Sequence, residues 1–181
     1  MYLRDEPIPY PLIYVVTCYP NELMHLLQKA VDTEKELIGE KIKYALSEGL
    51  NILVCSGETK EDKDSGKADD VIRRQIINIT ENVDKNQWNK IVIAYEAFWT
   101  VGTGQSLPVK EAQRILKSIR SIIAERVSQH IAEQARLIYA GSVNTENCKE
   151  FAAQPDIDGL LVGGASLKPE FVDIINVAKR I

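Results

Sequence analysis

One glutamate and three glycine-rich segments are the parts of this chain whose residue types and spacing could do chemistry. Glu96 directly follows the apolar run 90–95 (KIVIAY) and precedes a loop that contains Gly102 and Gly104. A carboxylate at the end of a buried strand is a candidate general base, and a loop beyond it could close over a ligand and exclude water. The alternative interpretation is that Glu96 caps a helix or pairs with a cation.

Glycines also follow the ends of two further apolar runs. Gly141 precedes Ser142 just after 136–139 (RLIY), and Gly163 and Gly164 come directly after 159–162 (GLLV). Glycine lets backbone N–H groups approach an anion closely, and a helix N-terminus beyond it adds a favourable dipole. Each glycine taken alone could serve only to make a tight turn. Three glycine-rich segments at the same end of the strands favour a phosphate site.

Alternating helical and strand-like patterns are expected to position these residues. Apolar runs typical of buried strands cover 51–55, 90–95, 136–139 and 159–162. Helical spacing of apolar residues covers 34–48, 71–83, 108–127, 145–152 and 169–179. The charged segment 58–70 is expected to be a solvated loop. Strands separated by helices predict βαβ units and a mostly parallel sheet, whose carboxyl ends would bring Glu96 and the glycines to one edge.

Length and composition limit the class of protein. The 181 residues are 45% hydrophobic and 27% charged, as expected for one globular domain over 1–181. The net charge of -4 argues against a nucleic-acid partner, and no stretch is long and apolar enough for a membrane span. The three cysteines are far apart and share no metal-ligand spacing. We therefore expect free thiols, no metal and a reducing, cytoplasmic compartment.

Residues 1–33 differ in character from the rest of the chain. They contain four of the seven prolines, one candidate strand at 12–18 and one candidate helix at 22–30. We interpret them as a divergent N-terminal segment, with the alternating pattern beginning at residue 34.

Four motifs of the chain are similar to those of the triosephosphate isomerase family. Residues 94–104 (AYEAFWTVGTG) resemble the family's AYEPVWAIGTG, and residues 139–143 (YAGSV) resemble YGGSV. Residues 156–167 (DIDGLLVGGASL) match DIDGFLVGGASL almost throughout, and residues 55–58 (CSGE) are similar to CIGE. The resemblance covers about residues 34–181 in uninterrupted order. It implies an α/β fold that is a partial (β/α)8 TIM barrel, with the C-terminal βα units present and the first strands missing.

The resemblance also implies an activity. Members of the family interconvert dihydroxyacetone phosphate and D-glyceraldehyde 3-phosphate by proton transfer through an enediolate, in glycolysis and gluconeogenesis, without cofactor or metal. Glu96 matches the family's general base. The residues that match its phosphate-binding groups are Gly102, Ser142, Gly163 and Gly164. Those that match its closing lid and latch are Trp99, Thr103 and Tyr139. Arg120 and Asp156 match a structural ion pair, and the family's homodimer implies self-association.

The sequence departs from the family pattern in two regions. In the lid, Ala97 replaces the hinge proline after the glutamate, and Ala140 replaces the first glycine of YGGSV. Ahead of residue 34, no segment resembles the strand that carries the family's substrate-binding lysine. His25 is the only histidine near the place of the family's electrophile, so we take it as the candidate. The alternative to an isomerase is a catalytically inactive truncated paralogue that retains at most phosphate or partner-subunit binding.

Overall fold

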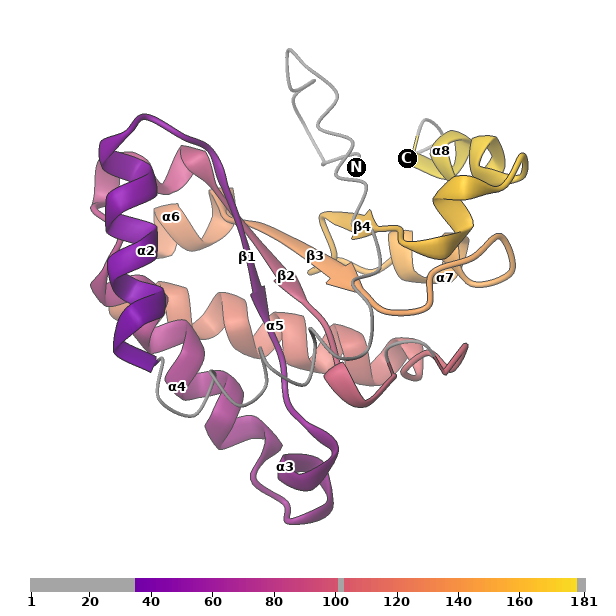
Figure 1. Ribbon diagram of the computed structural model, residues 1–181, viewed down its shortest axis with the longest axis horizontal. Coiled ribbons are helices and arrows are strands. Elements are labelled where there is room, and N and C mark those ends of the chain that lie inside the picture. The colour runs from indigo at the N-terminus through magenta and orange to yellow at the C-terminus, as the bar shows by residue number, and fades with distance from the viewer. Residues whose placement is uncertain (1–34, 101–102, 179–181) are drawn as a thin grey trace.

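The computed structural model describes residues 35–100 and 103–178, which alternate between helices and parallel strands (Figure 1). The strands are β1 (Ile52–Ser56), β2 (Ile91–Tyr95), β3 (Arg136–Ala140) and β4 (Gly159–Leu161). The α-helices are α2 (Lys35–Ser47), α3 (Lys60–Asp64), α4 (Ala68–Glu81), α5 (Val109–Arg126), α6 (Gln129–Gln134), α7 (Cys148–Ala152) and α8 (Phe171–Ala178). Short 3₁₀ helices are η1 (Lys85–Lys90), η2 (Phe98–Thr100) and η3 (Gly164–Leu167). The strand predicted at 12–18 and the helix predicted at 22–30 lie outside the described residues.

The four strands form one parallel sheet in the order β1-β2-β3-β4. Residues in register include Ser56 with Tyr95, Tyr95 with Tyr139, and Ala140 with Leu161. Every strand is therefore next to its chain neighbour, and the carboxyl ends of all four strands lie at one edge. This arrangement confirms the predicted βαβ units and their parallel sheet.

The two faces of the sheet are packed differently. One face contributes alternate residues such as Ile93 and Leu137 to a large core with helical side chains, including Ile76, Leu116 and Phe151. The opposite face forms a second cluster made only of strand residues: Leu53, Val92, Ala94, Ile138, Ala140 and Leu161. Strands in sequential order with helices packed on one face of the sheet are the pattern of consecutive βα units of a (β/α)8 barrel. A doubly wound sheet would instead carry helices on both of its faces.

The charged segment 58–70 is not the continuous solvated loop that its composition predicts. Residues Lys60–Asp64 form α3, and α4 already begins at Ala68. Thr59 caps α3 reciprocally: its hydroxyl oxygen accepts from the Asp62 N–H, and the Asp62 carboxylate accepts from the Thr59 N–H at 3.0 Å. This capping box stabilises a helix that buries none of its residues, so no hydrophobic periodicity could reveal it.

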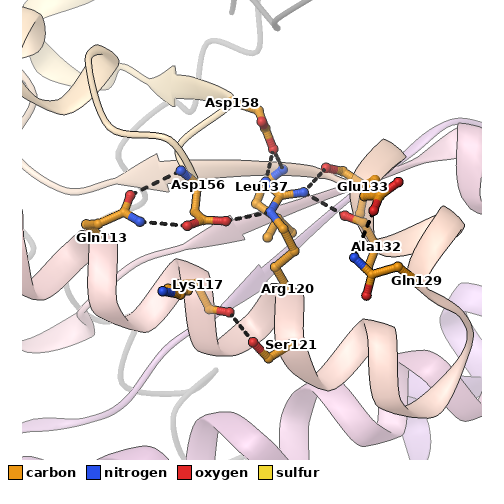
Figure 2. A network of polar contacts seen from close by, with 11 residues as sticks. Gln113, Lys117, Arg120, Ser121, Gln129, Ala132, Glu133, Leu137, Asp156 and Asp158 are labelled. Atoms are coloured by element: carbon orange, nitrogen blue, oxygen red, sulfur yellow. Dashed lines mark hydrogen bonds and ion pairs between the residues drawn. The ribbon is translucent and has the colours of Figure 1, made fainter.

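A polar network centred on Arg120 joins α5 to the start of β3 and the segment before β4 (Figure 2). The guanidinium donates to Asp156 at 2.8 Å and to Asp158 at 2.6 Å, and it also donates to the carbonyl oxygens of Ala132 and Ala135 at the end of α6. Asp158 in turn accepts from the Leu137 N–H at 2.8 Å. The Arg120–Asp156 ion pair is as expected from the sequence, and Asp158 is a second partner that the sequence analysis did not identify.

The large apolar side chains that remain exposed in the described part of the chain come from segments that precede β1 or follow β4. Ile38, Tyr44 and Leu50 come before β1, and Leu167 and Val172 come after β4. Tyr44 is 70% exposed and Leu167 is 80% exposed. Among the described helices, none combines the length and the apolar character that crossing a bilayer requires.

Candidate active site

Glu96 lies immediately after β2, at the carboxyl edge of the sheet. Its backbone N–H donates to the Ser56 carbonyl oxygen at 2.9 Å, so the pairing of β1 with β2 continues one residue past the strand. The side chain is half-buried, and among the described residues its carboxylate has no hydrogen-bond or ion-pair partner. Burial raises the pKa of this carboxyl above its ordinary value. A partly desolvated carboxylate without a partner is the state that a general base needs.

The backbone of Glu96 is held by the end of β1. Gly57 faces it so closely that a Cβ atom at this position would overlap the Glu96 carbonyl oxygen. Gln75 of α4 fixes the same turn, because its amide oxygen accepts from the Gly57 N–H at 3.0 Å and its amide nitrogen donates to the Gly57 carbonyl at 3.0 Å. The same amide oxygen accepts from the Ser56 hydroxyl at 2.8 Å. Position 57 therefore requires glycine because another backbone lies against it.

Glu58 is a second carboxylate at this edge, and it is only 3% exposed. It accepts a hydrogen bond from the Tyr95 hydroxyl at 3.1 Å and from the Trp99 indole N–H at 2.8 Å. Its backbone carbonyl accepts from the Phe98 N–H at 3.1 Å. Burial, together with the charge of Glu58, raises the pKa of Tyr95. Glu58 thus ties the residues that follow Glu96 to the end of β1.

The loop that follows Glu96 is described up to Thr100 and again from residue 103. The Thr100 hydroxyl is buried and donates to the Ala97 carbonyl at 2.7 Å, which closes the turn η2. Thr103 donates its hydroxyl to the Thr100 carbonyl at 2.7 Å, so its described hydrogen bonds stay within the loop. Gly102 and His25, both predicted as site residues, lie outside the described residues. Their roles remain predictions, as does the contact of Thr103 with a latch.

Tyr139 occupies the end of β3 and is fully buried. Its hydroxyl oxygen accepts from the Leu107 N–H at 3.2 Å, and its ring stacks on Phe151 with a centroid distance of 4.2 Å. A Cβ atom at Gly141 would lie 2.7 Å from the Tyr139 hydroxyl. Burial raises the pKa of Tyr139, against the opposing effect of the Leu107 N–H. The tyrosine therefore connects the end of β3 to the chain that leads into α5.

Ser142 and the two glycines after β4 complete the edge. Ser142 has φ of 31°, a left-handed conformation that is uncommon outside glycine, and its carbonyl accepts from the Asn147 side-chain amide at 3.0 Å. Gly163 precedes η3, and its carbonyl accepts from the Ser166 N–H at 2.9 Å. A Cβ atom at Gly163 or at Gly164 would meet no atom within 4 Å. The chain's own packing does not require glycine there, and the open space beside the backbone suits a bound anion.

The parallel register explains why these residues share one edge. Tyr95 pairs with Tyr139 and Ala140 pairs with Leu161, so Glu96, Ser142 and Gly163 each follow neighbouring strands. A partly desolvated carboxylate at the same sheet edge as backbone that leaves room for an anion is an arrangement that suits proton abstraction from a phosphorylated small molecule. Within the described ranges, no group of three histidine, cysteine or acidic side chains could hold a metal ion.

Two residues of this edge were missed by the sequence analysis as individual site residues. Glu58 carries the same signal that singled out Glu96, because it is a carboxylate just beyond an apolar strand. Gln75 carries no local signal, since its role depends on α4 lying against the end of β1.

Comparison with known proteins gives a consistent result. The family model described as "Triosephosphate isomerase" matches residues 27–178. The triosephosphate isomerase of Paracoccidioides lutzii is 45% identical over 174 residues, which cover 96% of this chain and 66% of the relative. The cytosolic triosephosphate isomerase of Oryza sativa subsp. japonica is 49% identical over 143 residues (79% and 56%), and that of Taenia solium is 47% identical over 145 residues (80% and 58%). The chain therefore spans 56% to 66% of the length of these curated relatives.

Proposed function

Because the chain belongs to the triosephosphate isomerase family, we propose that it interconverts dihydroxyacetone phosphate and D-glyceraldehyde 3-phosphate. The observation that carries the proposal is the Glu96 carboxylate, partly desolvated and without a partner in the described residues, at the same sheet edge as the glycine-rich ends of β3 and β4. The reaction moves hydrogen between adjacent carbons of one molecule and needs no external oxidant or reductant.

Glu96 acts as the base in this proposal. Its carboxylate removes a proton from the carbon next to the substrate carbonyl, and the C–H electron pair forms the double bond of an enediolate. In the same step the carbonyl π electron pair moves onto the carbonyl oxygen. The same carboxyl then returns the proton to the neighbouring carbon, and the hydroxyl proton passes from one oxygen to the other, which completes the isomerisation. Burial supports this role, because the raised pKa makes the carboxylate a stronger base than a fully hydrated one.

The substrate phosphate is held at the ends of β3 and β4. The backbone N–H groups of Gly163 and Gly164 and the segment at Ser142 supply donors, and the open space beside both glycines leaves room for the anion. Gly102 adds a donor from the loop after Glu96.

The remaining site residues keep the roles that the family resemblance implies. His25 is the electrophile that polarises the substrate carbonyl, and Trp99, Thr103 and Tyr139 form the lid and its latch. Loss of turnover in His25→Asn, with the binding of a phosphate-bearing inhibitor unchanged, is the result expected for an electrophile. A His25→Asn protein with unchanged turnover would remove His25 from the mechanism.

We further propose that the chain associates with itself and acts in the cytoplasm. The homodimer implied by the family resemblance supports association, and the exposed Tyr44 before β1 and Leu167 after β4 would each be stabilised by burial in an interface. The rice relative named cytosolic supports the location. Sedimentation of the purified chain should show a species heavier than 20.3 kDa, and a strictly monomeric chain at micromolar concentration would contradict association.

The activity is tested by a coupled assay on the full chain and on Glu96→Gln. Removing a positioned general base should lower kcat by about 10²- to 10⁴-fold. Glu125→Gln is the matched control, because Glu125 lies on the exposed surface and pairs with Arg73 at 3.0 Å. Equal activity in the wild type and in Glu96→Gln would refute the role of Glu96. A folded wild type that binds 2-phosphoglycolate without any turnover would instead indicate the inactive paralogue.

A further inference from the structure

The indole of Trp99 is held by two charged side chains from the segment that follows β1. Glu58 accepts a hydrogen bond from the indole N–H at 2.8 Å. The Lys63 ammonium nitrogen lies 3.4 Å from the centroid of the Trp99 ring. Trp99 belongs to η2, the turn that begins two residues after Glu96. Both contacts therefore hold the segment that directly follows Glu96, the proposed general base.

These two contacts match the charge distribution of an indole. The ring edge, including its N–H, is positive and faces a carboxylate, whereas the ring face is negative and lies under an ammonium group. A carboxylate alone fixes one point of the ring and leaves it free to rotate about the hydrogen bond. The ammonium contact fixes the plane of the ring as well.

The segment that carries the two charges is fixed by hydrogen bonds on both sides. The capping box of Thr59 and Asp62 starts α3 directly after Glu58, and Lys63 lies one turn further along the same helix. On the other side, the Phe98 N–H donates to the Glu58 carbonyl oxygen. Among the described residues Lys63 has no ion pair, so its contact with Trp99 is not in competition with a nearby carboxylate there.

We propose that Lys63 is a positioning residue, whose ammonium group holds the Trp99 indole against Glu58 and thereby fixes the Phe98–Thr100 turn that follows Glu96. The consequence for turnover rests on the proposed isomerase function, whereas the consequence for Trp99 does not. An exposed cation–π contact of this kind shifts an equilibrium by about two- to fivefold. Lys63 therefore adjusts the orientation of the turn and takes no part in the chemical steps.

The test uses the full chain labelled with 5-fluorotryptophan, because only two tryptophans, Trp88 and Trp99, contribute ¹⁹F resonances. Trp99→Phe assigns the two signals. Lys63→Met should move the Trp99 resonance by more than its line width and leave the Trp88 resonance in place. Lys63→Arg, which keeps a cation over the ring, should restore the wild-type position.

Lys60→Met is the matched control for this experiment. Lys60 is also a lysine of α3, but its ammonium pairs with Asp64 at 3.1 Å on the exposed surface. Its removal should leave both resonances unchanged. An unmoved Trp99 signal in Lys63→Met, or an equal movement in Lys60→Met, would overturn the proposal. Lys63→Gln serves as a second neutral variant, and thermal unfolding confirms that each variant is folded.

A kinetic measurement extends the test to the site. Lys63→Met should lower kcat/KM by about two- to fivefold, and Lys63→Arg should recover most of the loss. A wild type without isomerase activity would refute the proposed function, while the ¹⁹F result would still decide the role of Lys63. Full activity in Lys63→Met together with a moved Trp99 signal would show that the turn does not affect Glu96, and would overturn the positioning role.

Discussion

Replacement of Arg120 by methionine is the most informative perturbation of the fold, because one side chain joins three segments. The Arg120, Asp156 and Asp158 side chains are 17%, 16% and 15% exposed, so their charges are largely removed from water. Arg120→Met keeps much of the aliphatic packing and removes every donor. It leaves two carboxylates without their cation and two carbonyl oxygens at the end of α6 without donors.

The magnitude follows from these contacts. Removing one partner of a buried ion pair costs about 3–5 kcal/mol of the free energy of unfolding. Each carboxylate keeps one neutral donor, since Asp156 accepts from the Gln113 amide at 2.6 Å and Asp158 accepts from the Leu137 N–H. We therefore expect about 3 kcal/mol, the lower end of that range. Arg120→Lys keeps the charge, but one ammonium group cannot reach all four acceptors, so about 1–2 kcal/mol should be lost.

Urea unfolding followed by far-ultraviolet circular dichroism measures these differences. The midpoint should fall in the order wild type, Arg120→Lys, Arg120→Met, with the dependence on urea concentration unchanged. Arg126→Met is the matched control on the same helix. Arg126 pairs with Glu81 at 2.9 Å, with side chains 39% and 58% exposed, and its loss should cost about 0–1 kcal/mol.

The reasoning would be refuted by an Arg120→Met protein that is as stable as Arg126→Met. A double-mutant cycle with Asp158→Asn adds an independent check. The loss in the double variant should be smaller than the sum of the two single losses, because the neutral amide no longer needs the cation. Strict additivity would show that Arg120 and Asp158 do not stabilise one another.

Three further predictions concern the site itself. Because burial raises the pKa of Glu96, the folded chain binds its proton more tightly than the unfolded chain, so this group lowers stability as the pH rises above 4.5. Urea unfolding at pH 7 should therefore show a larger free energy of unfolding for Glu96→Gln than for the wild type. This difference in free energy should shrink as the pH is lowered toward 4.5, and a difference that does not change with pH would contradict the reasoning. Gly57→Ala should lower the free energy of unfolding by about 1–3 kcal/mol, because the new methyl group overlaps the Glu96 carbonyl. Gly163→Ala should leave the urea midpoint unchanged, because its methyl group meets no atom of the chain, and should weaken the binding of 2-phosphoglycolate measured by calorimetry. Tyr139→Phe should cost about 1–3 kcal/mol in the same unfolding assay, because the buried Leu107 N–H loses its acceptor; an unchanged midpoint would show that another acceptor replaces it.

The sheet could be predicted from the sequence because its strands are buried and continuous. The run predicted at 51–55 is the strand β1 (Ile52–Ser56), and the run predicted at 90–95 is β2 (Ile91–Tyr95). The helix α3 could not be predicted in this way, because a helix that buries no residue has no apolar stripe.

A site residue could be predicted from the sequence where a reactive side chain directly follows a strand. Glu96 was identified because it is a carboxylate at the end of a strand, and the structure places it at the expected edge. The requirement for glycine at position 57 was not predictable, because it arises from the backbone of a neighbouring strand. The contact of Glu58 with Trp99 was equally inaccessible, since it joins residues 41 positions apart and depends on how two loops pack.

Gln75 has a consequence for how the molecule opens. One carboxamide satisfies both the N–H and the carbonyl of Gly57, as the backbone of an adjacent strand would, although it belongs to α4. Separating α4 from the sheet therefore exposes a backbone amide that lies beyond the end of β1. The Gly57 amide proton should exchange with deuterium at the rate of α4 and not at the rate of the loop that follows, because the helix and the strand end open as one cooperative unit.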